Sequence, residues 1–419
     1  MLNYLLFAVY LVFLCWLLLR IRSIKNLGID SKIILGLFLF KIAAGIALGW
    51  LSLHFYGAAN DYWDINREAW NEYRLLLTDP SKYLTNIFTS DYPGGYGGLF
   101  SSYNSFWNDL KGNILIKLVS LFNIFSRGDY YINSLFFNFL VFFGHVALYK
   151  LFLKVYPGRK WLVMIGCFLL PSTLYFSSGI HKDGLVFLLL AVLLYTMYQM
   201  LNENRTGIKR LVLAGVCLAF LFLIRNFIFI VLTPALLAWI LSARYKWNVA
   251  IVFIAVYLTG ALLLFNINSV FPKIKPLEVI THRQTEYINL GPSDTQIELA
   301  VLNPGFKSFA ANAPQSLNHV LLRPYLWELP VKSLLPLNIE LAIYQLLFLL
   351  FLFFRRERSP GPGTPFLAFA IVFTFSLFLL IGYIVPNLGS IVRYRSLYLP
   401  LIITPLLCSI EWNSLKVIN

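Results

Sequence analysis

The sequence predicts an all-α polytopic membrane protein. Of its 419 residues, 59% are hydrophobic and only 13% are charged, and the mean hydropathy is +0.71. A soluble globular chain is about half apolar and about a quarter charged. Apolar runs of about 20 residues recur along the chain, and that length crosses roughly 30 Å of hydrocarbon. The runs do not alternate between apolar and polar residues as membrane β-strands do, so helices are predicted.

Eleven of these runs are predicted to cross the membrane, so residues 1–419 are expected to form a single integral membrane domain. Lys and Arg concentrate in short loops on one side of the runs, which is the positive-inside pattern. This distribution predicts an N-terminus outside the cell membrane and a C-terminus in the cytoplasm. The expected spans are 2–19, 33–55, 131–156, 161–176, 184–201, 211–224, 227–243, 248–265, 339–354, 365–385 and 397–410.

The net charge of +15 follows this topology, so it does not indicate a nucleic-acid partner. All four cysteines lie inside apolar runs, which favours buried free thiols over disulfides. The spacing of the histidines does not indicate a metal site, and no cofactor is expected. A divalent cation at Asp61 and Asp64 is the one alternative, because carboxylates are ligands for such ions.

Two long outer loops, residues 56–130 and 266–337, interrupt the series of spans. The first is dense in Tyr and Trp, which favour the headgroup layer, so helices lying in the membrane interface are expected there. Its apolar run 114–125 is too short to cross the membrane and is assigned to the same interface. The Pro- and Gly-rich residues 90–98 predict an irregular turn.

Ionisable side chains gather at the outer ends of the predicted spans. Such groups are costly at the mouth of a helix bundle unless they are paired or solvated, so they are candidates for function. The clusters are Asp61 with Asp64, His181 with Lys182 and Asp183, Arg225, Arg393 with Arg395, and, in the second long loop, Arg323 with Glu328.

Carboxylates that face cations suit the transfer of a sugar from a lipid phosphate. A carboxylate can take a proton from an acceptor hydroxyl. Arginine side chains can hold a phosphate with two hydrogen bonds each. Phosphate is a good leaving group, so it needs its charge stabilised more than it needs a proton.

The acidic stretch 59–70, with Asp61 and Asp64 just after an early span, resembles the GT-C glycosyltransferases of the dolichyl-phosphate-mannose-protein mannosyltransferase-like group. Residues 170–184 (LPSTLYFSSGIHKDG) and 389–400 (GSIVRYRSLYLP) resemble bacterial members. The chain departs from the family in two ways. Its acidic loop follows the second span rather than the first, and the spacing is Asp-x-x-Asp instead of an adjacent acidic pair.

This resemblance implies an inverting glycosyltransferase in a bacterial inner (cytoplasmic) membrane. The donor would be a sugar linked to a polyprenyl phosphate, surrounded by membrane lipids, and the acceptor a lipid, glycan or protein. Asp61 would be the catalytic base, with Asp64 second. The expected phosphate-binding residues are Arg393, Arg395, Lys182 and Arg225, and the expected substrate-binding residues are His181, Arg323 and Glu328.

Two other functions fit parts of the same pattern. A lipid-linked polysaccharide polymerase of the O-antigen type would also use outer arginines and long outer loops. A transporter or flippase carries charges near the middle of the membrane, where Lys41 is the main instance here. Purely structural roles are also open: Asp61 and Asp64 suit the start of a helix, and Arg393 and Arg395 suit anchoring to lipid headgroups.

Overall fold

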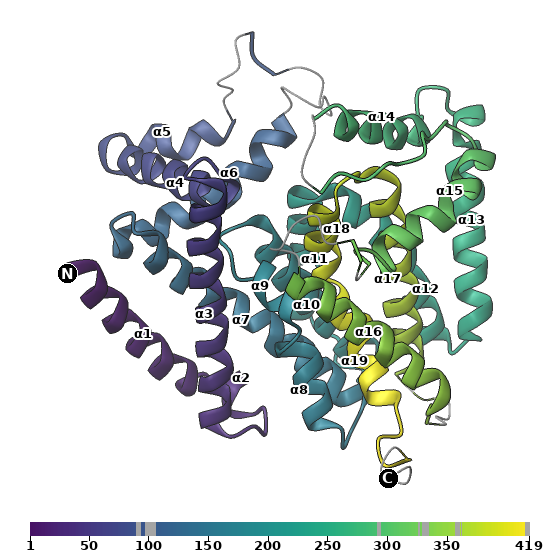
Figure 1. The fold of residues 1–419 in the computed structure, drawn as a ribbon, viewed down its shortest axis with the longest axis horizontal. Coiled ribbons are helices and arrows are strands. Elements are labelled where there is room, and N and C mark those ends of the chain that lie inside the picture. The colour runs from purple at the N-terminus through teal and green to yellow at the C-terminus, as the bar shows by residue number, and fades with distance from the viewer. Residues whose placement is uncertain are drawn as a thin grey trace. The chain divides into compact units, whose positions relative to one another are not determined.

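The computed structural model describes residues 1–88, 94–96, 106–290, 295–325, 327–328, 335–356, 361 and 363–414 (Figure 1). Within these residues the regular structure consists of α-helices and one short 3-10 helix, with two isolated β-bridges and no strand. The all-α prediction is therefore confirmed for the described part of the chain. Most of residues 90–98, predicted as an irregular turn, lies outside it.

Among the described residues, eight helices are long and apolar enough to cross a membrane. Each coincides with an expected span, so the chain is a multi-pass membrane protein. A ninth crossing is present if α18 (Leu388–Ser396) and α19 (Leu399–Ser409), bent by 64° to one another, count as one. The eight helices are α1 (Leu2–Arg20), α3 (Ser31–Tyr56), α7 (Tyr130–Val155), α10 (Lys182–Asn202), α12 (Asn226–Tyr245), α13 (Val249–Val270), α16 (Leu335–Phe353) and α17 (Thr364–Ile384).

The remaining expected spans are shorter or broken. The run 161–176 forms α8 (Lys160–Phe168) and α9 (Pro171–Phe176), which separate just before Pro171. Proline lacks the amide hydrogen that a continuous helix needs and also restricts the residue before it. The run 211–224 forms α11 (Ile208–Ile224), which has 17 residues. The described helices thus support eight or nine crossings by length and composition, and the number eleven stays a prediction.

Further helices occupy much of the two predicted outer loops. The first loop contains α4 (Asp61–Thr78), α5 (Pro80–Thr85), η1 (Asn86–Phe88) and α6 (Phe106–Ser126), and the second contains α14 (Pro276–Ile288) and α15 (Phe306–Leu321). A short α2 (Arg22–Lys25) follows α1. Figure 1 shows α4 and α5 running across the end of α3 rather than continuing along it.

The chain divides into two compact units that are interleaved in sequence. Unit 1 consists of Met1–Leu151, Leu174–Met197 and Gly207–Phe227, and unit 2 consists of Phe152–Thr173, Tyr198–Thr206 and Ile228–Asn419. Because the chain passes between the units several times, neither corresponds to one continuous segment. The single integral domain over residues 1–419 stays a prediction.

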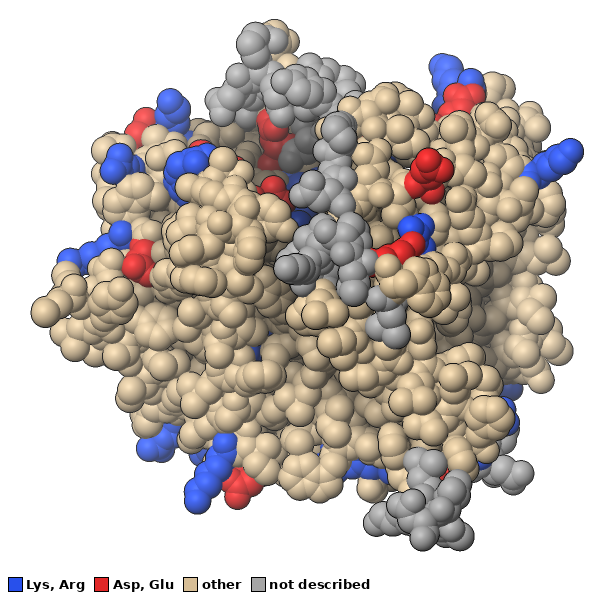
Figure 2. All heavy atoms as spheres, in the orientation of Figure 1, with Lys and Arg blue, Asp and Glu red and all other residues tan. Residues whose placement is uncertain are grey.

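Unit 1 places its apolar surface outward on α1 and α3. Large side chains of α1 such as Val12 and Trp16 are more than half exposed, whereas only Leu14 and Leu18 of this helix are buried. Figure 2 shows this surface as almost uniformly uncharged, with Lys and Arg side chains near the lower ends of α1 and α3. Since exposed apolar area of this size is unfavourable in water, these helix faces suit contact with lipid.

Unit 2 has an aromatic core. The rings of Trp239, Phe366, Phe369 and Phe373 are in contact along α12 and α17, at centroid separations of 5.0–6.3 Å. Tyr398 continues the series at 5.9 Å from Phe373. Offset and edge-on ring contacts of this kind add about 0.5–1.5 kcal/mol each beyond the burial of their area.

Candidate functional site

The acidic stretch begins helix α4. Asn60 caps this helix, since its side-chain oxygen accepts hydrogen bonds from the backbone N–H groups of Tyr62 at 3.1 Å and Trp63 at 3.3 Å. Asp61 and Asp64 therefore lie in the first turn, where a negative charge is favoured by the helix dipole. The Asp61 side chain is 67% exposed, whereas Asp64 forms an ion pair with Arg67 at 2.8 Å.

The segment that carries His181 is buried within unit 1. Residues 177–181 join α9 to α10, and Ser177, Ser178 and His181 are nearly inaccessible. The sequence had placed His181 in an ionisable cluster at the outer end of a predicted span. A buried segment of this kind needs hydrogen-bond partners inside the protein, because its backbone N–H and C=O groups are bonded neither within a helix nor to water.

Lys41 and Asn138 supply those partners. The Lys41 Nζ, on a residue that is only 1% exposed, donates to the hydroxyl of Ser177 at 3.0 Å, to the hydroxyl of Ser178 at 3.1 Å, and to the Ser177 carbonyl at 3.4 Å. The Asn138 amide donates to the Ser178 carbonyl at 2.8 Å. Lys41 lies about 22 Å along α3 from the last residue of that helix, Tyr56. Segment 177–181 is therefore held far from the end of α3, inside the bundle.

The buried segment 177–181 ends at a series of ionisable side chains that contact one another. His181 Nδ1 lies 3.0 Å from a carboxylate oxygen of Asp183, and the other oxygen of Asp183 is paired with the Arg225 guanidinium. The Asp183 side chain is 1% exposed and that of Arg225 is 5% exposed. A buried carboxylate is stable only when it is paired and hydrogen-bonded, and these two neighbours provide that.

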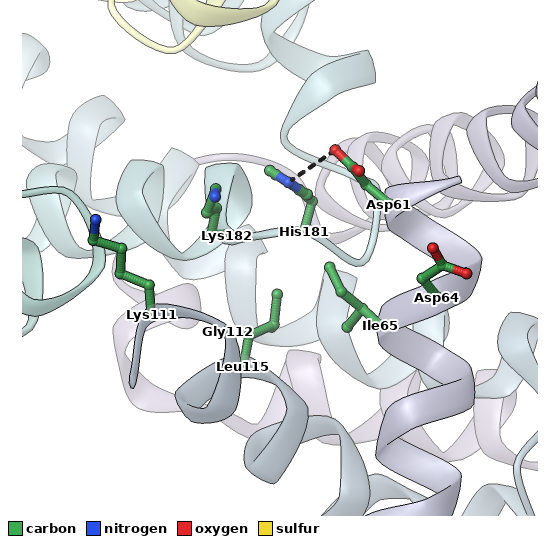
Figure 3. A pocket seen from close by; sticks show the side chains of 8 residues that line it. All are labelled: Asp61, Asp64, Ile65, Lys111, Gly112, Leu115, His181 and Lys182. Carbon is green, nitrogen blue, oxygen red and sulfur yellow. Dashed lines mark ion pairs between the residues drawn. The ribbon is translucent and has the colours of Figure 1, made fainter. Parts of the chain in front are cut away.

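The opposite ring nitrogen of His181 faces the start of α4. Its Nε2 lies 3.8 Å from the Asp61 carboxylate, and the two side chains point toward one another (Figure 3). The Tyr62 ring contacts the imidazole edge-on at a centroid distance of 5.6 Å. The structure thus brings Asp61, His181 and Arg225, to which the sequence had assigned separate roles, into one chain of contacts through Asp183.

A pocket of about 250 Å³ opens beside this chain of contacts. Two carboxylates and two lysines lie around it, with apolar side chains between them, so it can accommodate a ligand that carries negative charge next to neutral groups. Its lining comes from α4, α6 and the start of α10 (Figure 3). The lining residues are Asp61, Asp64, Ile65, Lys111, Gly112, Leu115, His181 and Lys182.

Lys111 was missed by sequence analysis. It stands in α6 between the Pro- and Gly-rich residues and the apolar run 114–125, and a single lysine beside an apolar run carries no signal of a site. Only the packing of α6 against α4 brings it to the pocket. Lys111 thus adds a second lysine to the pocket lining, after Lys182, which was predicted to bind phosphate.

The other predicted site residues belong to unit 2. Arg395 is buried, and its Nη1 donates to the carbonyls of Val320 at 2.7 Å and Arg323 at 2.6 Å. A cation at this position stabilises the C-terminal end of α15. Arg393 is half-buried beside the Tyr394 ring, at 6.0 Å from its centroid. Asp61 and Arg393 belong to different units, so their proximity stays a prediction.

Arg323 and Glu328 form an ion pair with two hydrogen bonds, of 2.9 Å and 2.6 Å. Burial alone would raise the pKa of Glu328, but the Arg323 guanidinium outweighs it and lowers the pKa below its ordinary value. Burial and then Arg323 lower the pKa of the neighbouring His319. Both members of the pair were expected to bind substrate, and in unit 2 they bind one another.

The described residues contain no group of three or more His, Cys, Asp or Glu side chains arranged to hold a metal ion. Two carboxylates and His181 border the pocket, but Asp64 is turned to Arg67 and His181 to Asp183. The divalent cation considered for Asp61 and Asp64 therefore stays an alternative without a defined ligand set.

No protein-family model, curated protein or solved structure matches the chain. The resemblance to GT-C glycosyltransferases thus rests on the short stretches quoted above, and the function has to be argued from the pocket of unit 1.

Proposed function

We propose that the protein is a glycosyltransferase that moves a sugar from a polyprenyl-phosphate-linked donor to an acceptor on the outer face of a bacterial inner membrane. The observation that supports this best is the pocket, because the exposed acidic residue Asp61 and the two lysines Lys111 and Lys182 are among the residues that line it. Helix α4, which lines the pocket, is hydrogen-bonded through Trp63 to the Gly49 carbonyl of α3, an apolar helix long enough to span a membrane. A lipid-linked phosphate needs both surroundings at once.

In the proposed reaction, the acceptor oxygen attacks the anomeric carbon of the donor sugar from the face opposite the phosphate. The bond between that carbon and the phosphate oxygen breaks, its electron pair leaves with the polyprenyl phosphate, and the configuration is inverted. Asp61 takes the proton of the acceptor hydroxyl. Lys111 and Lys182 stabilise the charge that develops on the departing phosphate, and Asp64 is the second carboxylate of the site.

The remaining predicted residues take supporting places in this proposal. Arg225 is held by Asp183 and buried, which supports a positioning role rather than phosphate binding. Arg393 and Arg395 stay candidates for contact with the donor phosphate or with lipid headgroups. We further propose eleven crossings, completed by the shorter or bent elements α8–α9, α11 and α18–α19, with an N-terminus outside and a cytoplasmic C-terminus, as the Lys and Arg distribution predicts.

The test is donor turnover by the purified protein in lipid nanodiscs. A panel of polyprenyl-phosphate sugars is offered with a panel of hydroxyl acceptors, and released polyprenyl phosphate is measured by mass spectrometry. Asp61→Asn is expected to reduce turnover at least 10²-fold, the usual contribution of a general base. The matched control is Glu68→Gln, an exposed carboxylate on the same helix that does not line the pocket.

Two outcomes would reject the proposal. One is full turnover by Asp61→Asn, which would remove the catalytic base. The other is an absence of polyprenyl phosphate release from any donor by a folded wild-type protein. Products that carry long repeating chains rather than single additions would point instead to the polysaccharide polymerase.

A further inference from the structure

We propose that His181 is the final proton acceptor of the pocket, with Asp183 and Arg225 as the residues that position it. This inference rests on the proposed function for the source of the proton, which is the acceptor hydroxyl. It adds a catalytic role for a residue that the sequence had assigned only to substrate binding. The geometry on which it stands is a continuous row of contacts from Asp61 to Arg225.

The two ring nitrogens of His181 have different partners. The Asp183 backbone N–H donates to Nδ1 at 3.3 Å, a contact that favours an unprotonated Nδ1, whereas the Asp183 carboxylate lies 3.0 Å from the same atom and accepts a hydrogen bond only from a protonated one. The carboxylate contact is shorter and charge-assisted, so it determines the tautomer and keeps a proton on Nδ1. Nε2 is then an unprotonated acceptor directed at Asp61 and the pocket, ready to receive a proton.

The buried pair holds the ring in this state. Asp183 cannot turn away from His181 without also leaving Arg225, because both of its oxygens are engaged. When His181 becomes an imidazolium, Asp183 stabilises the new charge at 3.0 Å, as a carboxylate behind a catalytic histidine does. Arg225 keeps Asp183 ionised in its buried position by pairing with it.

The proton passes through the pocket in two steps. As the acceptor oxygen bonds to the anomeric carbon, its O–H bond breaks and the proton moves to the Asp61 carboxylate. Imidazole is a stronger base than a carboxylate in water, so the proton then moves from Asp61 to Nε2 of His181. The separation of 3.8 Å exceeds a hydrogen bond and is closed by one water molecule or by a rotation of the exposed Asp61 side chain. Asp61 is thereby restored as a carboxylate.

Several charges decide when His181 titrates. Both carboxylates that face the ring favour the imidazolium, and the nearby cations oppose it. The groups around the ring are Asp61 and Tyr62 from α4, Lys111 from α6, Lys182 and Asp183 from α10, and Arg225 after α11.

Nitrogen-15 histidine NMR of the protein in lipid bilayers tests the inference without any substrate. The chain has five histidines, and His181→Gln identifies the relevant signals. The neutral His181 ring is expected to carry its proton on Nδ1. In Asp61→Asn its titration midpoint should fall by about one pH unit, the effect of losing one partly solvated charge at this distance. Glu68→Gln should leave the midpoint unchanged.

A second variant is designed so that no buried charge is left without its partner. Replacing Asp183 alone strands a buried guanidinium, so Asp183→Asn is combined with Arg225→Gln, which removes both charges together. The ring should then lose its fixed Nδ1–H tautomer, and its midpoint should fall. In wild-type protein, the acidic limb of the pH–rate profile for polyprenyl phosphate release should follow the NMR midpoint of His181.

The outcomes separate the two proposals. A wild-type ring protonated on Nε2, or a midpoint that is the same in Asp61→Asn, overturns the role of His181 even if sugar transfer occurs. An acidic limb unrelated to the NMR midpoint does the same. The expected tautomer and midpoint shift, found in a protein that releases no polyprenyl phosphate from any donor, support the proton-accepting row and reject the glycosyltransferase.

Discussion

The ion pair between Asp183 and Arg225 gives the sharpest prediction about stability. Both side chains are at least 95% buried, so removing one partner takes the counter-charge away from a group that water does not reach. We expect Asp183→Ala to lower the free energy of unfolding by about 3–5 kcal/mol, the usual cost of breaking a buried pair from one side. Arg225→Met should also be destabilising but should cost less, because the buried carboxylate of Asp183 keeps its contact with His181.

The double variant Asp183→Ala/Arg225→Met should be more stable than the sum of the two single changes predicts. Replacing a whole buried pair by uncharged side chains is often close to neutral, so most of the loss should be recovered. A double-mutant cycle measures this difference directly. Tryptophan fluorescence during denaturant titration of the protein in detergent micelles gives the required free energies.

Unit 1 contains a matched control in the pair of Asp64 with Arg67. It joins the same residue types at 2.8 Å, but its side chains are 40% and 58% exposed. Asp64→Ala should cost about 0–1 kcal/mol, since an exposed ion pair contributes little. The reasoning would be refuted if the buried and exposed pairs cost the same, or if the losses of Asp183→Ala and Arg225→Met simply added.

Three further predictions concern other parts of the chain. Lys41→Ala should lower the free energy of unfolding by about 2–4 kcal/mol in the same titration, because it opens a cavity and leaves buried oxygens without a donor; a cost below 1 kcal/mol would contradict its anchoring role. The pKa of Glu328 is lowered in the folded protein, so its pairing with Arg323 stabilises the folded state at pH values above the pKa that Glu328 has in the unfolded chain. This stabilisation is lost as the pH falls through the pKa of Glu328 in the folded protein. Glu328→Gln should therefore flatten the acid dependence of the melting temperature below about pH 4.3, and an unchanged dependence would contradict the role of this pair. Gly382→Ala should lower the melting temperature, because its Cβ would lie 2.1 Å from the Ser316 carbonyl oxygen and overpacking costs about 1–3 kcal/mol; Gly260→Ala, which meets open space, is the control.

Much of the fold could be predicted from hydropathy, because a helix that crosses lipid needs a long run of apolar residues. Eight spans followed from that requirement. The break in the helix before Pro171 could not be predicted in this way, because the length of an apolar run does not say whether its helix is continuous. The burial of segment 177–181, which Lys41 holds inside unit 1, could not be predicted either. Lys41 was singled out as unusual, but its partner lies 136 residues away.

The candidate site was predictable in its residue types and not in its pairings. Asp61, His181, Lys182 and Arg225 were all named from the cost of placing ionisable groups near a membrane. Which of them meet depends on contacts between residues 42 or more positions apart, and periodicity carries no information about such contacts. That is why Arg225 was assigned to phosphate, whereas the structure pairs it with Asp183.

The same pair imposes an order on the synthesis of the protein. Asp183 leaves the ribosome 42 residues before Arg225, which corresponds to roughly 2–8 s at ordinary elongation rates. During that interval the nascent α10 carries a carboxylate that has not yet met its partner Arg225, and a charged residue disfavours release of a helix into lipid. We expect α10 to wait at the insertion machinery until α11 emerges, so that the two helices enter the bilayer together as a hairpin and the charges neutralise one another on arrival.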